Sequence, residues 1–243
     1  MNEFLTIDIG NTKAKYAVFN DKNIVESHVF DPISDDITNL LQQHPTINKG
    51  IISSVGGNVN KCLAQLKNIK MIVLSSETKL PFTLNYKEKS KIGADRLALV
   101  AAAFDERPHQ NSLVIDIGTC ITYDILTADD RHIRGPISPG MQLRFKSMHE
   151  HTALLPLCEP TLNELKIICD DTTECLQSGV QLGVLHEIKD FIKLYSLKFN
   201  DLNIFISGGD NIFLQNQLKN YTFASSNFMF NGLRLILEYN DNQ

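Results

Sequence analysis

The sequence predicts an α/β fold that is built from two similar half-domains. Residues 5–12 read Leu-Thr-Ile-Asp-Ile-Gly-Asn-Thr, and residues 113–119 read Leu-Val-Ile-Asp-Ile-Gly-Thr. In each segment an apolar run of strand character leads to an aspartate, and then to a glycine that allows a tight turn. One copy lies near the start of the 243-residue chain and the other near its middle. This arrangement indicates two half-domains that face each other, with a nucleotide held between them.

The composition favours a globular protein with a small-molecule partner. Hydrophobic residues make up 43% of the chain and charged residues 21%, which is ordinary for a folded domain and argues against disorder. Lys and Arg number 23 against 28 Asp and Glu, which gives a net charge of −5. Because the sequence contains no basic block, we expect no nucleic-acid partner.

The N-terminal residues and the cysteines favour the cytoplasm. The first three residues lack the basic region of a signal peptide, and no apolar run approaches the roughly 18 residues that cross a bilayer. We therefore expect a cytoplasmic protein with no membrane partner. The cysteines include no C-x-x-C pair and are expected to be reduced thiols, mostly in the core: Cys62, Cys120, Cys158, Cys169 and Cys175.

Apolar periodicity in the first half predicts alternating strands and helices. Strands are expected at residues 4–9, 13–19, 24–30, 50–53 and 71–74, and the first three should form a meander. Helices are expected at residues 34–43 and 58–67. The first of them should be capped by Ser34 or Asp35 and stopped at His44-Pro45. Residues 75–90 are expected to be irregular and are suited to carry binding residues.

The segment Gly93-Ala94-Asp95-Arg96 opens a run with clear helical spacing of its apolar residues. Asp95 and Arg96 fall in the first turn, where free N–H groups and the positive end of the helix dipole favour a carboxylate or an anionic ligand. The residues alone leave two interpretations open. Either these side chains serve a ligand, or Asp95 caps the helix and Arg96 pairs with it on the surface.

A short connection at residues 108–111 is expected to divide the chain into an N-terminal lobe, 1–110, and a C-terminal lobe, 111–243. In the second lobe, strands are expected at residues 112–117, 121–126, 131–134 and 204–206. Residues 135–140 should form a rigid loop before a helix at 141–151. A long helix is expected from residue 172 to about residue 199, and a final helix at 227–239.

The residues after the first strand are suited to bind phosphate and magnesium. Asp8 offers a carboxylate to magnesium, and Lys15 adds a positive charge nearby. Between them, Gly10, Asn11 and Thr12 offer backbone N–H groups and a hydroxyl to phosphate oxygens. The sequence contains neither the G-x-x-x-x-G-K-[ST] phosphate loop nor the G-x-G-x-x-G dinucleotide fingerprint. A strand-end aspartate is often part of a plain turn, but its recurrence at Asp116 favours a nucleotide site.

Several motifs follow one another along nearly the whole chain. They are Asp8-Ile9-Gly10-Asn11-Thr12 with Lys15, Ser53-Ser54-Val55, Gly93-Ala94-Asp95-Arg96, Asp116-Ile117-Gly118-Thr119, residues 135–140, Thr152-Ala153-Leu154-Leu155-Pro156, Thr172 ahead of Ser178-Gly179, and Ser207-Gly208-Gly209. In this order and spacing they resemble the type III pantothenate kinases, within the superfamily of acetate and sugar kinases, heat-shock chaperones and actin. Pro136 departs from the family, which often has glycine there; proline stiffens the backbone and removes one N–H donor.

The resemblance implies two ribonuclease-H-like lobes, as in actin-like ATPases, with the nucleotide in the interlobe cleft. It implies ATP-dependent phosphorylation of the primary hydroxyl of pantothenate, which yields 4'-phosphopantothenate and is the first step of coenzyme A biosynthesis. The implied cofactors are ATP with Mg²⁺ and a monovalent cation, K⁺ or NH₄⁺. The implied assembly is a homodimer.

The resemblance also implies roles for individual residues. Asp95 is expected to be the general base, Asp116 to bind the monovalent cation and Asp8 to help place magnesium. The residues expected to hold ATP and its phosphates are Asp8, Ile9, Gly10, Asn11, Thr12, Lys13, Ala14, Lys15 and Thr119. The residues expected to contact pantothenate are Tyr86, Gly93, Ala94, Asp95, Arg96 and Thr172, with Thr173 as the alternative to Thr172.

Two other functions remain open. A kinase of the same superfamily could act on another small acceptor, such as a sugar, acetate or polyphosphate, although the Gly-Ala-Asp-Arg motif argues against it. A catalytically silent accessory or regulatory relative is the other alternative. The presence of Asp8, Asp95 and Asp116 argues against that alternative without proving activity.

Overall fold

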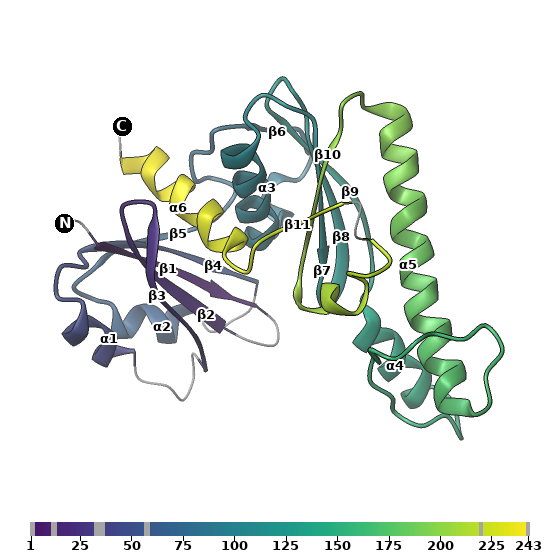
Figure 1. Ribbon diagram of the computed structural model, residues 1–243. Coiled ribbons are helices and arrows are strands. Elements are labelled where there is room, and N and C mark those ends of the chain that lie inside the picture. Colours follow the sequence, from purple (N-terminus) through teal and green to yellow (C-terminus); the bar gives the residue numbers. More distant parts are fainter. Residues whose placement is uncertain (1–2, 11–13, 32–36, 56–58, 219–220, 242–243) are drawn as a thin grey trace. The chain divides into compact units, whose positions relative to one another are not determined.

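Figure 1 shows the computed structural model, which describes residues 3–10, 14–31, 37–55, 59–218 and 221–241. The predicted helix caps Ser34 and Asp35 lie outside these described residues. The chain divides into two compact units. The first comprises Met1–His109, Asp129–Ile133 and Ser226–Gln243, and the second comprises Gln110–Ala128 and Arg134–Ser225. Both ends of the sequence therefore belong to the first unit. The expected boundary after residue 110 would instead place the two ends in different lobes.

The first unit contains a mixed five-stranded sheet with the strand order β3-β2-β1-β4-β5. Its strands are β1 (Glu3–Ile9), β2 (Ala14–Asn20), β3 (Asn23–Phe30), β4 (Lys49–Ser54) and β5 (Lys70–Val73). Strands β1 to β3 form the antiparallel meander that the sequence predicts. Strand β4 pairs in parallel with β1, and β5 pairs in parallel with β4.

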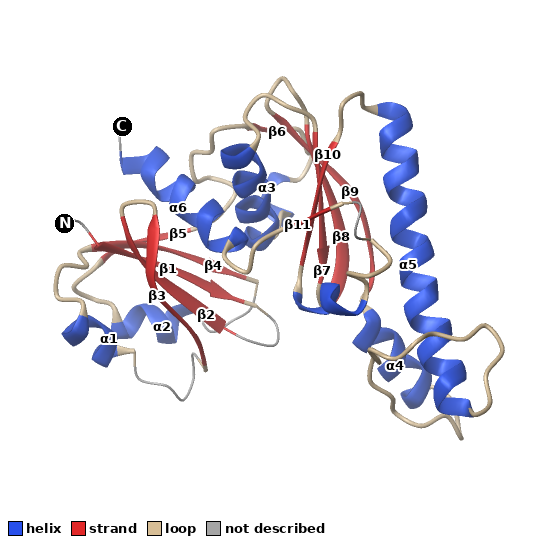
Figure 2. Ribbon diagram, in the orientation of Figure 1, coloured by secondary structure: helices blue, strands red, loops and turns tan. Residues whose placement is uncertain are grey.

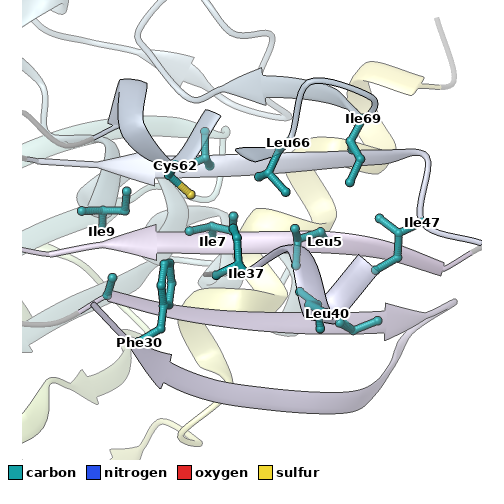
Figure 3. Close-up of a cluster of buried hydrophobic side chains, with 13 residues drawn as sticks. Leu5, Ile7, Ile9, Phe30, Ile37, Leu40, Ile47, Cys62, Leu66 and Ile69 are labelled. Atoms are coloured by element: carbon teal, nitrogen blue, oxygen red, sulfur yellow. The ribbon is translucent and has the colours of Figure 1, made fainter. Parts of the chain in front are cut away.

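Apolar side chains on one face of this sheet form a buried core (Figure 3). Leu5, Ile7 and Ile9 of β1 all contribute to it, because alternate residues of a strand point to the same face. Two short helices, α1 (Thr38–Gln43) and α2 (Val59–Gln65), supply further apolar side chains to this core. The odd-numbered positions of β1 are thus used for stability, which leaves the even-numbered positions for the other face.

Two longer helices of the first unit, α3 (Ala94–Glu106) and α6 (Phe228–Asp241), lie side by side and both contact β4 (Figures 1 and 2). Gly232 of α6 permits their close approach, because a Cβ atom there would lie only 1.8 Å from the carbonyl oxygen of Ala98 in α3. This packing explains why residues from the C-terminal end of the chain belong to the first unit.

The second unit repeats the strand order of the first. Its strands are β7 (Ser112–Ile117), β8 (Cys120–Leu126), β9 (Arg131–Pro139) from Arg134 onward, β10 (Asn203–Ser207) and β11 (Thr222–Phe223), in the order β11-β10-β7-β8-β9. Strand β7 is antiparallel to β8 and parallel to β10, and β10 is parallel to β11. β7 therefore takes the place that β1 has in the first sheet. The repeated topology confirms the predicted α/β duplication.

The remaining elements are a short strand and two 3₁₀ turns. Strand β6 (Thr83–Leu84) pairs in parallel with Arg131 and His132 at the start of β9, and these paired residues all belong to the first unit. Two 3₁₀ turns, η1 (Lys89–Lys91) and η2 (Gly209–Phe213), follow β6 and β10 along the chain. In the part of the chain that the structure describes, no helix is both long enough and apolar enough to span a membrane.

Helices α4 (Met141–Glu150) and α5 (Thr172–Lys198) of the second unit lie close to their predicted positions. The prediction of a loop at residues 135–140 is wrong, because β9 continues to Pro139. Beyond its first two residues β9 has no described partner on the β6 side, and an edge strand tolerates a proline because the missing N–H is not needed there.

Candidate active site

The carboxyl end of β1 places three polar side chains in one row. Asp8 is paired in register with Lys15 on β2 and with Ser53 on β4. These positions alternate with the apolar residues of the core, so all three side chains point to the opposite face of the sheet. Ser53 is fully buried, Asp8 is half-buried and Lys15 is exposed. The predicted grouping of Asp8 with Lys15 is therefore present in the structure.

Asp8 lies in an environment that disfavours its negative charge. Burial raises the pKa of its carboxyl to about 6, and the charge of Asp95 contributes to the increase. The hydroxyl of Ser53 and the charge of Lys15 act in the opposite direction and limit it. A cation or a proton that binds between two carboxylates reduces their mutual repulsion.

Asp95 comes to this environment from the first turn of α3. Gly93 is the N-cap, and the Asp95 carboxylate accepts a hydrogen bond of 2.8 Å from the backbone N–H of Arg96. A Cβ atom at position 93 would lie 2.4 Å from Oδ1 of Asp95, so glycine leaves room for this carboxylate. The helix N-terminus offers further N–H groups and the positive end of its dipole.

The alternative in which Asp95 is only a cap and Arg96 is its surface partner is wrong in two respects. The cap position belongs to Gly93, and Arg96 is 3% exposed. The arginine is drawn inward because α3 buries most of its length, from Ala94 to Ala103. The sequence pattern predicts the apolar stripe of this helix, but it does not predict that the first turn is buried.

The second unit carries a comparable strand end at Asp116. This residue is paired in register with Thr122 on β8 and with Ser207 on β10, as Asp8 is with Lys15 and Ser53. Asp116 is half-buried and Thr119, in the following turn, is exposed. The two strand ends therefore share their geometry but differ in the charge of the antiparallel neighbour.

Glycines close the backbone around the turn that follows Asp116. Gly140 donates a hydrogen bond of 3.0 Å to the carbonyl of Thr119, and a Cβ atom at Gly140 would lie 2.0 Å from the carbonyl oxygen of Gly118. Gly208 has φ +99°, and a Cβ atom there would lie 2.2 Å from the carbonyl oxygen of Ile117. Three backbone segments thus approach one another closely at the turn after Asp116, and the two glycines make this packing possible.

The other residues predicted to contact pantothenate or ATP lie in several parts of the two units. Tyr86 is exposed and lines a hollow of about 370 Å³ in the first unit, together with Asn85, Lys87 and Glu88. Thr172 and Thr173 are exposed at the start of α5 in the second unit. Ile9 and Ala14 are buried, and Gly10 is half-buried beside Asp8. Asn11, Thr12 and Lys13 lie outside the described residues.

Two residues with a place in the site received no role from the sequence. Ser53 and Ser207 lie at or next to the end of the strand that runs parallel to an aspartate strand, at the position directly beside the aspartate. The available signal was the shared pattern of a serine at a strand end shortly before a Gly-Gly pair. Because carboxyl ends of parallel strands meet at one edge of a sheet, that pattern places both serines beside the carboxylates.

Among the described residues no cluster of three or more His, Cys, Asp or Glu side chains is arranged to hold a metal ion. Asp8 and Asp95 provide two carboxylates. Magnesium in kinases commonly takes one or two carboxylates, with the remaining ligands supplied by water and by substrate phosphates. The donor set of the first unit therefore fits a magnesium ion that arrives with a nucleotide.

Solved structures with the same architecture include kinases. A putative transcriptional activator of the Baf family from Campylobacter jejuni matches with a TM-score of 0.64 at 24% identity, covering 98% of this chain and 100% of that chain. A putative N-acetylmannosamine kinase from Listeria monocytogenes matches with a TM-score of 0.57 at 13% identity, covering 99% and 100%. At these identities the likeness concerns the fold alone, and it confirms the predicted class of two ribonuclease-H-like lobes.

Sequence similarity defines the family more closely. The family model of type III pantothenate kinases matches residues 4–194. A type III pantothenate kinase from Christiangramia forsetii is 43% identical over 242 residues, which span 98% of this chain and 99% of that protein. A second, from Flavobacterium johnsoniae, is 38% identical and covers 97% of each chain. The chain belongs to the type III pantothenate kinase family.

Proposed function

We propose that this chain transfers the terminal phosphoryl group of ATP to the primary hydroxyl of pantothenate, the first step of coenzyme A biosynthesis. Membership of the type III pantothenate kinase family supports this activity. The structural observation that carries the proposal is the carboxylate pair of the first unit, in which burial and the charge of Asp95, at a helix N-terminus, together raise the pKa of Asp8 at a strand end. In protein kinases, one carboxylate holds the metal ion and another accepts the proton of the substrate hydroxyl.

In this proposal Asp95 is the general base. The pantothenate hydroxyl gives its proton to the Asp95 carboxylate as its oxygen bonds to the γ-phosphorus, and the bond to the β,γ-bridging oxygen breaks to release ADP. The hydrogen bond from the Arg96 N–H keeps one carboxylate oxygen occupied and fixes its orientation.

The proposed nucleotide contacts are residues at the two strand ends. The Asp8–Lys15 segment and Thr119 hold the phosphates, and Asp8 helps to place magnesium. When bound, magnesium neutralises charge that develops on the phosphate oxygens. Asp116, which precedes the turn at Gly118 and Thr119, is proposed to hold a monovalent cation. Tyr86, residues 93–96 and Thr172 are proposed to contact pantothenate.

We also propose a cytoplasmic homodimer. The long helix α5 supports a subunit contact, because Leu194 and Leu197 near its end are 59% and 78% exposed. Large apolar side chains so exposed on one helix favour a covering surface. Light scattering coupled to size-exclusion chromatography measures the mass directly, and a monomer at all concentrations would remove the dimer from the proposal.

The test of the activity is ADP release by the purified protein with ATP and magnesium. Four reactions are compared: with and without pantothenate, each in potassium and in sodium salt. We expect ADP to appear only with pantothenate and to rise with potassium. If no ADP forms with pantothenate although a thermal shift shows ATP binding, the proposed acceptor is wrong, and sugars, acetate and polyphosphate are the next acceptors to screen.

A further inference from the structure

Two thiols meet at the start of α5. Cys169 lies in the irregular segment before the helix, two residues ahead of the N-cap Asp171, and Cys175 lies in the first turn. The thiol of Cys169 donates a hydrogen bond of 3.4 Å to the carbonyl oxygen of Lys166, and Cys169 lies near enough to Cys175 to raise the pKa of its thiol. Both are free thiols; Cys175 is exposed and Cys169 is half-exposed. A peroxide or a small disulfide in solution can therefore reach the pair.

Polar contacts fold the segment before α5 back onto its first turn. Lys166 Nζ binds the carboxylates of Asp170 at 2.8 Å and Glu174 at 2.9 Å. The backbone N–H of Asp170 donates to Glu174 Oε2 at 3.0 Å, and the N–H of Glu174 donates to Asp171 Oδ1 at 2.9 Å. These contacts join the residue after Cys169 to the residue before Cys175. These contacts thus hold the segment that carries Cys169 against the first turn of α5.

We propose that Cys169 and Cys175 form an oxidation-sensitive dithiol, which a peroxide converts into a disulfide across the start of α5. A disulfide needs the sulfurs to approach to about 2.0 Å, and the irregular backbone at Cys169 can adjust to allow this. The other cysteines differ from the pair: Cys62 and Cys158 are buried, and Cys120 is half-buried in the second unit.

The oxidation is a two-step reaction with a balanced outcome. One thiolate attacks the peroxide O–O bond and becomes a sulfenic acid, while the second peroxide oxygen leaves as water after taking a proton. The other thiol then attacks the sulfenic sulfur, the S–S bond forms and a second water leaves. Two thiols and one peroxide thus give one disulfide and two waters.

The surroundings of Cys175 disfavour its thiolate. Partial loss of contact with water raises the pKa of its thiol, and Cys169 and the negative charges of Asp171 and Glu174 raise it further.

The disulfide closes a ring that contains Thr172. This consequence rests on the proposed function, in which Thr172 contacts pantothenate. Drawing the sulfurs together moves the N-cap and the first turn, and Cys175 also lines a hollow of about 750 Å³ between α4 and α5. We expect oxidation to raise the KM for pantothenate severalfold with a smaller change in kcat, and a thiol reductant to reverse the effect.

The dithiol is tested without reference to activity. The folded protein is treated with hydrogen peroxide, remaining thiols are alkylated, and the tryptic peptide of residues 167–189, which contains both cysteines, is weighed. We expect a peptide that is lighter by two hydrogen atoms and carries no alkyl group. Cys169→Ser and Cys175→Ser should each abolish this species, and Cys120→Ser should retain it. Sulfinic acid, or a disulfide to a second chain, in place of the internal disulfide would overturn the proposal.

Kinetics then separate the dithiol from its consequence. If the internal disulfide forms and the KM for pantothenate is unchanged, the proposed effect on Thr172 is wrong. If the reduced protein does not turn over pantothenate at all, the proposed function fails, and the peptide mass still decides the dithiol. If peroxide raises the KM for pantothenate in the wild type but not in Cys169→Ser, the result supports both the dithiol and its effect on pantothenate binding.

Discussion

Asp8 and Asp116 occupy the same position in two sheets of the same topology, yet their surroundings differ. Each precedes an isoleucine and a glycine at the end of the central strand, and each has a serine beside it on the parallel neighbour. On the antiparallel neighbour Asp8 has Lys15, whereas Asp116 has Thr122. The charge of Asp95 also contributes to the raised pKa of Asp8.

The difference indicates how two sheets of the same topology can place their aspartates in different chemical roles. The first unit surrounds its aspartate with ionisable side chains, an arrangement suited to placing metal and moving a proton. The second unit packs glycine backbone at the turn that follows its aspartate, where the proposed phosphate and cation contacts lie. The predictions below test this division of roles, beginning with the largest expected effect.

The backbone packing of the second unit is tested by Gly208→Ala. The residue has φ +99°, and the added Cβ would meet the carbonyl oxygen of Ile117 at 2.2 Å. Strain and overpacking together should lower the free energy of unfolding by about 3 kcal/mol. Urea unfolding followed by circular dichroism measures this loss.

Gly209→Ala is the matched control for that substitution. No atom lies within 4 Å of a Cβ built at Gly209. Its stability should stay within about 0.5 kcal/mol of the wild type. Equal losses for the two variants would show that the close approach at Gly208 does not hold the turn.

The cation role of the second unit is tested by Asp116→Ala. Because outer-shell partners of a metal ion alone are worth roughly 10- to 100-fold in affinity, loss of a direct ligand should weaken the potassium response by at least about tenfold. The rate supported by sodium should change less. Initial rates over a potassium titration measure the effect, and an unaltered titration curve would assign the cation to another residue.

An ionisable network also joins strands of the first sheet. His44 contacts Glu3 of β1 through Nδ1 and Glu26 of β3 through Nε2, both at 3.1 Å. Burial lowers the pKa of His44, but hydrogen bonds to the two glutamates outweigh it and the net pKa is raised above 6.5. A raised histidine pKa gives stability that is fully present below the unfolded pKa and is lost as pH rises through the folded pKa.

His44→Gln should therefore cost more stability in acid than in alkali. We expect a loss of about 1 kcal/mol below about pH 6.5, shrinking as the wild-type histidine is deprotonated at higher pH. Urea midpoints of the wild type and the variant, measured across this range, test the sign. A loss that grows with rising pH would contradict the assignment of the network.

The sequence predicted the parts of the fold that depend on local pattern. The apolar runs that end at Asp8 and Asp116 became the central strands, and the helical spacing after Gly93 became α3. Asp8 and Lys15 could be grouped from their spacing, because a short antiparallel connection brings residues of adjacent strands into register.

Other features depend on packing between segments distant in sequence. The continuation of β9 through Pro136 depends on its position at an edge, which local composition does not reveal. The return of α6 to the first unit depends on the contact of Gly232 with Ala98. The burial of Arg96 and the placement of Ser53 beside Asp8 likewise follow from tertiary packing and strand register.

The most direct test of the account is turnover by Asp95→Asn. The amide keeps the shape of the carboxylate but cannot accept the hydroxyl proton, so pantothenate-dependent ADP release should fall by roughly 100- to 10,000-fold. ATP binding, measured by calorimetry, should remain, and the pKa of Asp8 should fall because the charge of Asp95 helps to raise it. Turnover within a few-fold of the wild type would contradict the assignment of Asp95 as the base.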